Sequence, residues 1–82
     1  MEIVKVSLKL IATYRQLLPS GVKGNIIEVE IPPGTQVGGL LGRFDVPLDA
    51  ASVVLVNGVG VELDYELESG DVVSAFPAMA GG

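Results

Sequence analysis

Apolar and polar residues alternate near the N-terminus of the chain. From Val4 to Leu10 every second residue is apolar, and the positions between them carry lysine and serine. Because side chains on a strand point alternately to its two faces, this period of two predicts a half-buried strand over residues 3–11. Val4, Val6, Leu8 and Leu10 are expected to face inward. By the same parity, Ile11 is expected on the outer, polar face.

A second alternating stretch follows at residues 25–31. Ile27, Val29 and Ile31 are expected to face inward, and Glu28 and Glu30 outward. Between the two stretches, residues 12–24 are rich in proline, serine and glycine after position 18, which predicts a loop or wide hairpin turn. The two strands are therefore expected to form an N-terminal hairpin.

A short helix is predicted after the second strand. The Pro32-Pro33-Gly34 sequence ends that strand, since proline cannot donate to a β-ladder. Thr35 is suited to be the helix N-cap, and Gly42 is a plausible stop. The apolar positions between them, at helical spacing, are Val37, Leu40 and Leu41. Gly38 and Gly39 each cost a helix about 1 kcal/mol relative to alanine, so the helix is expected to be short or weak.

The last third of the chain predicts three more strands. Residues 52–58 form an apolar run closed by Asn57-Gly58, a pair typical of tight turns. Residues 59–67 begin as a short strand and continue as an alternating stretch with Leu63, Tyr65 and Leu67 on one side. A turn at 68–71 leads to a final strand at 72–77. Strands grouped around one helix predict a two-layer α+β domain.

Composition excludes several classes of function. The 82 residues allow one domain, and they include no cysteine and no histidine, so a disulfide, a thiolate or histidine metal site and an imidazole base are all excluded. The net charge of −5, with five scattered basic residues, argues against a nucleic-acid partner. No apolar stretch approaches about 18 residues, and the N-terminus lacks a signal-peptide layout. A soluble, cytoplasmic protein without membrane contact is expected.

The acidic positions near the C-terminus have an ordinary explanation. They are Glu62, Asp64, Glu66, Glu68 and Asp71. Because they alternate with apolar residues, a solvated strand face is favoured over a docking surface or a cation site, and the ligand order of a calcium loop is absent. We therefore expect no metal site.

The chain ends in FPAMAGG, with two glycines directly after a hydrophobic strand. The ordinary interpretation is a frayed terminus. The functional one is that the terminal carboxylate is the reactive group: it is a poor electrophile when ionised, but ATP could activate it as an acyl-adenylate, from which a sulfur nucleophile displaces AMP. Glycine leaves the carbonyl unhindered. We expect a globular domain over residues 1–77 and a flexible tail over 78–82, of which residues 79–82 would reach about 13 Å when extended.

Several short motifs resemble the MoaD/ThiS family of sulfur carriers, which are ubiquitin-like β-grasp proteins ending in Gly-Gly. These motifs are the FPAMAGG tail, the Ser-Gly-Asp turn at 69–71 and the Val-Asn-Gly turn at 56–58. ATYRQLL at 12–18 resembles the molybdopterin-synthase branch more than the thiamine branch. One departure is Ala78, where many carriers of the molybdopterin branch have a second proline after the one that corresponds to Pro77.

The resemblance implies a fold and a chemistry. The fold would be a mixed sheet packed on one helix, with the first and last strands as parallel central neighbours. A ubiquitin-activating-like adenylyltransferase would use ATP to adenylate Gly82, with Gly81 as a spacer, and sulfur transfer would give a thiocarboxylate. The large subunit of molybdopterin synthase would then be the second partner. The chain itself would bind no cofactor and supply no catalytic side chain.

The family docks through an exposed apolar surface on the sheet, and four residues are candidates for that role here. Phe76 on the last strand and Ile11 at the end of the first match the family's docking positions. Pro77 would stiffen the exit of the tail, and Met79 would enter the partner with it. The ordinary interpretation of Phe76 is a cap on the edge of the core.

Other functions remain open on these residues. The carrier could serve thiamine, cysteine, tRNA thiolation or a tungsten-pterin route. The chain could instead be a ubiquitin-like modifier that is joined through Gly82 to a target lysine. It could also be an interaction domain with an inert tail.

Overall fold

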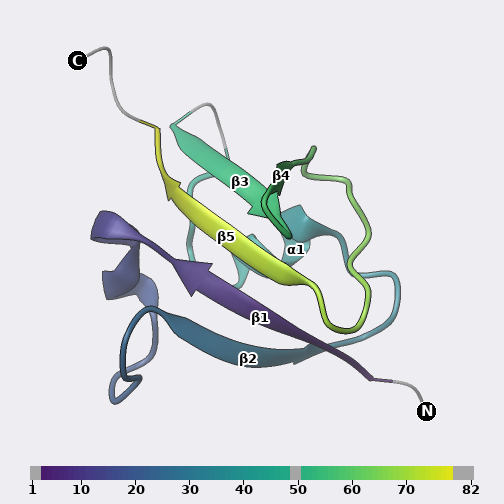
Figure 1. The fold of residues 1–82 in the computed structure, drawn as a ribbon, viewed down its shortest axis with the longest axis horizontal. Helices are drawn as coiled ribbons and strands as arrows, with labels where there is room; N and C mark the ends of the chain where they lie inside the picture. The colour runs from purple at the N-terminus through teal and green to yellow at the C-terminus, as the bar shows by residue number, and fades with distance from the viewer. Residues whose placement is uncertain (1–2, 49–50, 79–82) are drawn as a thin grey trace.

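The protein is described by a computed structural model that covers residues 3–48 and 51–78. Five strands form one mixed sheet in the order β2-β1-β5-β3-β4 (Figure 1). The strands are β1 (Val4–Leu10), β2 (Ile26–Ile31), β3 (Ser52–Val56), β4 (Val59–Gly60) and β5 (Val72–Pro77). The helices are a 3-10 helix, η1 (Ala12–Leu17), and an α-helix, α1 (Val37–Gly42).

The first and last strands lie side by side at the centre of the sheet. β1 and β5 are parallel, and Leu10 lies opposite Ala75. β1 also pairs with β2 as the expected antiparallel hairpin, and β3 pairs with β5 and β4. The predicted α+β, β-grasp arrangement of a mixed sheet on one short helix is confirmed.

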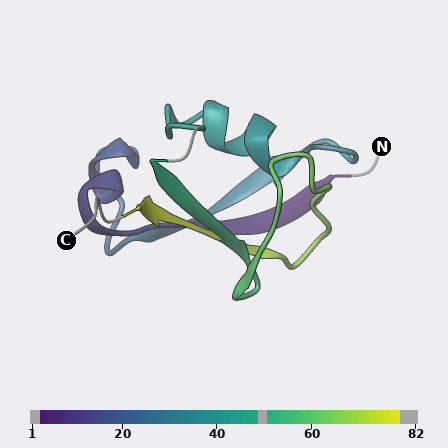
Figure 2. The same cartoon turned by 90° about the horizontal axis from the view of Figure 1, so that it is seen from above.

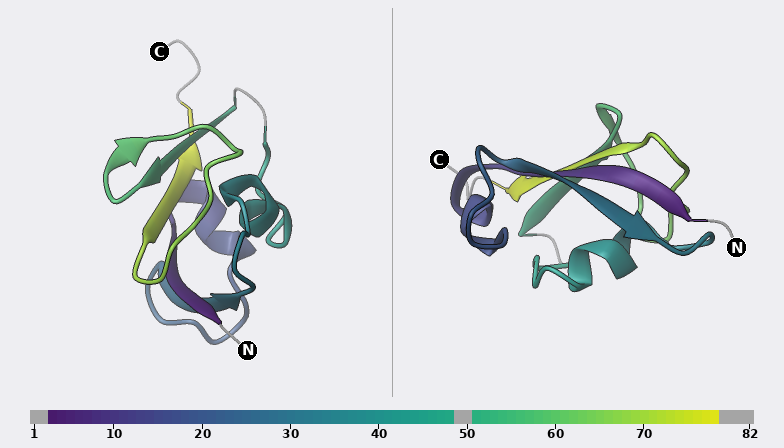
Figure 3. Two further views of the ribbon diagram at one scale, coloured as in Figure 1. Left: turned by 90° about the vertical axis from the view of Figure 1, so that its right-hand side faces the viewer. Right: turned by 90° about the horizontal axis from the view of Figure 1, so that it is seen from below.

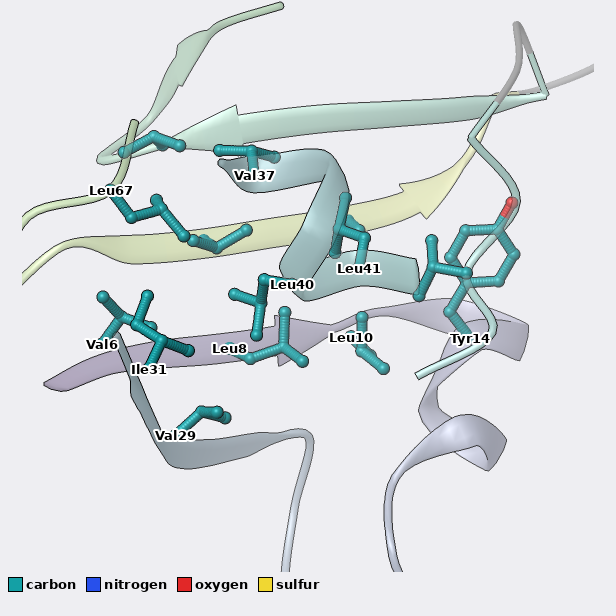
Figure 4. Packing of buried hydrophobic residues seen from close by; sticks show 14 residues of the cluster. Val6, Leu8, Leu10, Tyr14, Val29, Ile31, Val37, Leu40, Leu41 and Leu67 are labelled. Carbon is teal, nitrogen blue, oxygen red and sulfur yellow. The ribbon is translucent and has the colours of Figure 1, made fainter. Parts of the chain in front are cut away.

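The core lies between the sheet and α1. Figure 4 shows Leu40 and Leu41 of α1 facing Leu8 and Leu10 of β1. The fully or nearly buried positions include every inward residue predicted for β1 and β2 except Val4 and Ile27, which are partly buried and pack against the cluster. Alternation in sequence therefore identified the inner face of both strands.

One face of the sheet is covered and the other is open. α1 and η1 lie on the same side of the sheet, as Figures 2 and 3 show. Among residues 3–48 and 51–78, no helix or strand covers the opposite side. The open face is therefore the surface available to a partner.

The segment after β1 is helical, so the prediction of a loop over residues 12–24 was wrong in its first half. Tyr14 is buried, and Leu17 and Leu18 pack against the core. Tyr14 and Leu17 are three residues apart, so they lie on one face of the 3-10 helix, and Leu18 follows as its C-cap. The turn-forming residues are concentrated after position 18, and their presence obscured this short pattern.

α1 begins one residue later than expected, because Thr35 is not its N-cap. Gln36 occupies that position without a side-chain hydrogen bond. The hydroxyl of Thr35 instead donates to the carbonyl oxygen of Pro32 at 2.7 Å. Gly42 is the last helical residue, as predicted.

Backbone carbonyls of a distant segment cap the first turn of α1. The N–H of Val37 donates to the carbonyl oxygen of Tyr65 at 2.8 Å, and the N–H of Gly38 donates to that of Leu63 at 2.9 Å. These bonds satisfy donors that a helix N-terminus leaves without intrahelical partners. A Cβ on Gly38 would lie 3.2 Å from the Leu63 oxygen, so glycine at this position allows the close approach.

The segment over residues 59–67 was predicted to be a strand, but only Val59 and Gly60 form one, β4. The capping of α1 explains this difference, because residues 63–65 bind the helix. After β4 the segment forms only an isolated bridge between Gln36 and Glu66. Tyr65 is 38% exposed, whereas Leu67 is buried. The prediction that Leu63, Tyr65 and Leu67 lie on one side of an alternating strand was therefore wrong, because this segment pairs with the start of α1 and not with a neighbouring strand.

Candidate docking face and tail root

Half-buried apolar side chains occupy one half of the open face. On β5, Val73 and Ala75 are buried in the core, so Val72 and Phe76 have the opposite parity. Phe76 lies opposite Val53 of β3, and Ser74 lies opposite Leu55. None of these apolar side chains belongs to the core or packs against it. We call Ile11, Val53, Leu55, Val72 and Phe76 the apolar patch.

Ile11 and Phe76, the two predicted docking positions, lie next to each other. Its N–H donates to the carbonyl oxygen of Ala75 at 3.0 Å, which continues the β1–β5 pairing by one residue. Leu10 before it is fully buried, so Ile11, which is half-buried, points to the open side. The structure therefore brings together two residues that are far apart in the sequence.

The other half of the open face is charged. On β1, Lys5 and Lys9 alternate with core residues, and on β2 the outward residues are Ile26, Glu28 and Glu30. Lys5 lies opposite Glu30. A partner that covers the whole face would meet an apolar surface on β3 and β5 and a mostly charged one on β1 and β2, where Ile26 is the exposed apolar residue of β2.

Sequence reasoning missed Val53 and Leu55. Residues 52–56 are continuously apolar after Ser52, so no alternation assigned their faces. The cross-strand register with β5 supplies that assignment. A short apolar run of this kind predicts a strand but does not assign its two faces.

The tail leaves the sheet from a hydrogen-bonded position. Pro77 is the last residue of β5 and lies opposite Ser52. The next residue, Ala78, donates its N–H to the carbonyl oxygen of Ala51 at 2.7 Å. We call Pro77 and Ala78 the tail root. Met79, Gly81 and Gly82, which the sequence assigned to partner binding and chemistry, lie outside the described residues.

The two turns that resemble the carrier family are joined in one network. The Asp71 carboxylate accepts from Nδ2 of Asn57 at 3.0 Å and from the N–H of Glu68 at 2.9 Å. Oδ1 of Asn57 accepts from the N–H of Val72 at 2.9 Å. The Asn57-Gly58 turn has φ angles of 53° and 85°, which fit a type I′ hairpin turn. This network lies at the start of β5, a strand's length from the tail root.

The network corrects one part of the acidic series. Asp71 is only 8% exposed and has a structural role, so it does not belong to a solvated face. The other four, Glu62, Asp64, Glu66 and Glu68, are exposed as expected. Within the described ranges, no group of three or more His, Cys, Asp or Glu residues could hold a metal ion.

Both helices of the described residues are six residues long. Neither is long enough to cross a bilayer.

Comparison with known proteins identifies the family. The model of the ThiS family matches residues 8–82. The Pyrococcus furiosus protein assigned as molybdopterin converting factor subunit 1 is 33% identical to the chain, covering 93% of this chain and 99% of that one, with a TM-score of 0.74. Comparison with curated protein sequences gave no match.

Two further solved structures share the fold. The HVO 2177 protein of Haloferax volcanii is 26% identical, with 98% of this chain and 88% of that chain covered and a TM-score of 0.80. Urm1 of Trypanosoma brucei is 18% identical, with 100% and 99% covered and a TM-score of 0.69, which is a likeness of fold alone. With its sheet, its short helix and a family match over residues 8–82, the chain belongs to the ThiS family of ubiquitin-fold, MoaD/ThiS-like carriers and modifiers.

Proposed function

We propose that this protein is a sulfur carrier with Gly82 as its reactive terminal residue, and that it serves as the small subunit of a molybdopterin synthase. The observation that carries the proposal is the 33% identity, over 93% of the chain, with a protein assigned as molybdopterin converting factor subunit 1. The FPAMAGG sequence supplies the terminus that the chemistry needs.

The proposed chemistry takes place in two steps on the terminal carboxylate. First, a carboxylate oxygen of Gly82 attacks the α-phosphorus of ATP, and pyrophosphate leaves, which gives an acyl-adenylate. Second, hydrosulfide attacks the carbonyl carbon and AMP leaves with the bond electrons, which gives a thiocarboxylate and a proton. A ubiquitin-activating-like adenylyltransferase would catalyse the first step, because a chain without cysteine and histidine has neither a thiolate nor an imidazole base of its own.

The arrangement of the tail root supports delivery of the terminus to a partner. β5 is hydrogen-bonded on both sides, by β1 and β3, so its end is fixed in the sheet. Two residues of the apolar patch, Val72 and Phe76, lie on the same strand, with Phe76 directly before the tail root. A partner that binds the patch would hold Ala78 close to its own surface, and residues 79–82 could then reach about 13 Å into an active site.

Intact mass spectrometry tests the carrier chemistry. The untagged protein is incubated with ATP, a sulfide source and its activating enzyme. The expected result is a gain in mass equal to the replacement of one oxygen by sulfur, localised to Gly82. An unchanged mass, with an activating enzyme that charges a known carrier in the same assay, would refute the proposal.

The sulfur acceptor is tested separately. The charged protein is mixed with the large subunit of molybdopterin synthase and the cyclic pterin precursor, and loss of the extra mass with formation of the dithiolene supports the molybdopterin role. Charging without transfer to the pterin would leave thiamine or tRNA thiolation as the acceptor pathway. A conjugate in cell extract that joins Gly82 to a lysine of another protein would instead indicate a ubiquitin-like modifier.

A further inference from the structure

Tyr14 makes hydrogen bonds at the edge of the core beside the tail root. Its ring packs in the hydrophobic cluster and is 9% exposed. Its hydroxyl oxygen points away from the other labelled side chains in Figure 4. That oxygen lies 2.6 Å from Oγ of Ser52, and Oγ of Ser52 lies 2.6 Å from the carbonyl oxygen of Pro47. A phenylalanine would fill the same space in the core, so the hydroxyl needs a separate explanation.

Counting protons gives these bonds a direction. The carbonyl oxygen of Pro47 can only accept, so the single hydroxyl proton of Ser52 is donated to it. The bond between Tyr14 and Ser52 must then use the proton of Tyr14. A second, weaker contact joins the Tyr14 hydroxyl to the carbonyl oxygen of Ala51 at 3.4 Å. Tyr14 therefore donates to the first residues of β3.

Ala51 and Ser52, at the start of β3, also hold the tail root. Ser52 lies opposite Pro77 in the β3–β5 ladder, and the carbonyl oxygen of Ala51 accepts from the N–H of Ala78. A continuous series of contacts thus runs from η1, through the start of β3, to the last described residue before the tail. It is separate from the apolar patch, because Tyr14 packs with the core on the covered side of the sheet, whereas the patch lies on the open side.

We propose that Tyr14 and Ser52 are positioning residues that fix the direction in which the tail leaves the sheet. The inference rests on the proposed function, since a fixed exit matters only if the terminus must reach a partner's active site. A shift of about 1 Å in a reacting group can lower a rate by as much as a hundredfold. The patch would determine how tightly the partner binds, and Tyr14 would determine how productively the bound tail is placed.

The variant that tests this is Tyr14→Phe, which keeps the ring and removes the hydroxyl. Its matched control is Tyr65→Phe, since Tyr65 lies on the exposed segment that caps α1. Steady-state kinetics of charging by the activating enzyme are measured for both variants and for wild type. For Tyr14→Phe we expect kcat to fall about tenfold while KM stays within about twofold. The control should match wild type in both constants.

A second readout does not depend on charging. Hydrogen exchange of the Ala78 amide, followed by NMR in the free protein, should be about three- to tenfold faster in Tyr14→Phe and unchanged in Tyr65→Phe. Ser52→Ala should reproduce both effects, and it serves as the second variant if Tyr14→Phe does not fold.

Each outcome decides the inference. Wild-type exchange and kinetics in Tyr14→Phe would overturn it, and so would a raised KM at constant kcat, because that result would assign Tyr14 to docking. If the activating enzyme does not charge even the wild type, the proposed function fails. The exchange of Ala78 would in that case still show whether Tyr14 holds the tail root.

Discussion

Alanine substitutions at the two adjacent glycines of α1 should have different effects on stability. Sequence alone treats Gly38 and Gly39 alike, as two residues that weaken a helix by about 1 kcal/mol each relative to alanine. The structure separates them. A Cβ on Gly39 would meet only Cγ2 of Thr35, at 3.9 Å, which is ordinary van der Waals contact. A Cβ on Gly38 would lie 3.2 Å from the backbone oxygen of Leu63 and 3.3 Å from the Cβ of Leu63.

The magnitudes follow from these contacts. Gly39→Ala should stabilise the protein by about 0.5–1 kcal/mol, because alanine loses less conformational freedom on folding. In Gly38→Ala the same gain is opposed, since the segment around Leu63 must move by a few tenths of an ångström. That movement stretches the 2.9 Å bond from the Gly38 N–H to the Leu63 oxygen, and losing such a bond costs about 0.5–1.5 kcal/mol. Gly38→Ala should therefore be neutral or destabilising by up to about 1 kcal/mol.

Urea denaturation of the two variants and the wild type measures the difference. We expect the free energy of unfolding of Gly39→Ala to exceed that of Gly38→Ala by about 1 kcal/mol, with equal m-values. For a domain of this size, this difference corresponds to roughly 4–8 °C in Tm. Equal stabilisation by both substitutions would refute the argument that the close approach of residues 63–65 requires glycine at position 38.

Three other predictions concern the patch, the buried carboxylate and the tail. Phe76→Ala should raise KM for the activating enzyme about tenfold without changing Tm by more than a few degrees, whereas Val59→Ala, an exposed residue outside the patch, should leave KM unchanged. Asp71→Ala should lower the free energy of unfolding by about 1–3 kcal/mol in urea denaturation, because two part-buried hydrogen bonds lose their acceptor, and the exposed Glu68→Gln should stay within about 0.5 kcal/mol. An unchanged midpoint for Asp71→Ala would contradict the structural role of the carboxylate. Deletion of Gly82 should abolish the mass gain on charging while circular dichroism and Tm stay at wild-type values; a retained gain would place the reactive group elsewhere.

Much of the fold could be predicted from local patterns. β1 and β2 follow a period of two, so their inner faces were identified correctly, and Asn57-Gly58 marked a turn that the φ angles fit. The errors fall where tertiary contacts determine the local structure. Thr35 has a good N-cap side chain, yet residues 63–65 provide the acceptors for α1 and leave Thr35 to close the turn at Pro32.

The candidate site was predictable in part for a similar reason. Parity placed Ile11 and Phe76 on the outer face, but only the β3–β5 register shows that Val53 and Leu55 extend the patch. The hydroxyl of Tyr14 could not be interpreted from sequence, because its partners are 37 and 38 residues away. Asp71 resembled the exposed acidic residues before it, and only its two donors distinguish it.

The position of β5 at the centre of the sheet has a consequence for how the chain folds. β1 pairs with β5, and one bond at their junction joins Lys5 to Ser69, which are 64 residues apart. Neither the sheet centre nor the cap of α1 can form from local contacts, and a six-residue helix is too short to be stable alone. Folding should therefore be slower than that of a helical domain of this size, whose contacts are mostly local. A nascent chain that lacks β5 would have no assembled core, so the strand that carries the tail root is also the last one needed for folding.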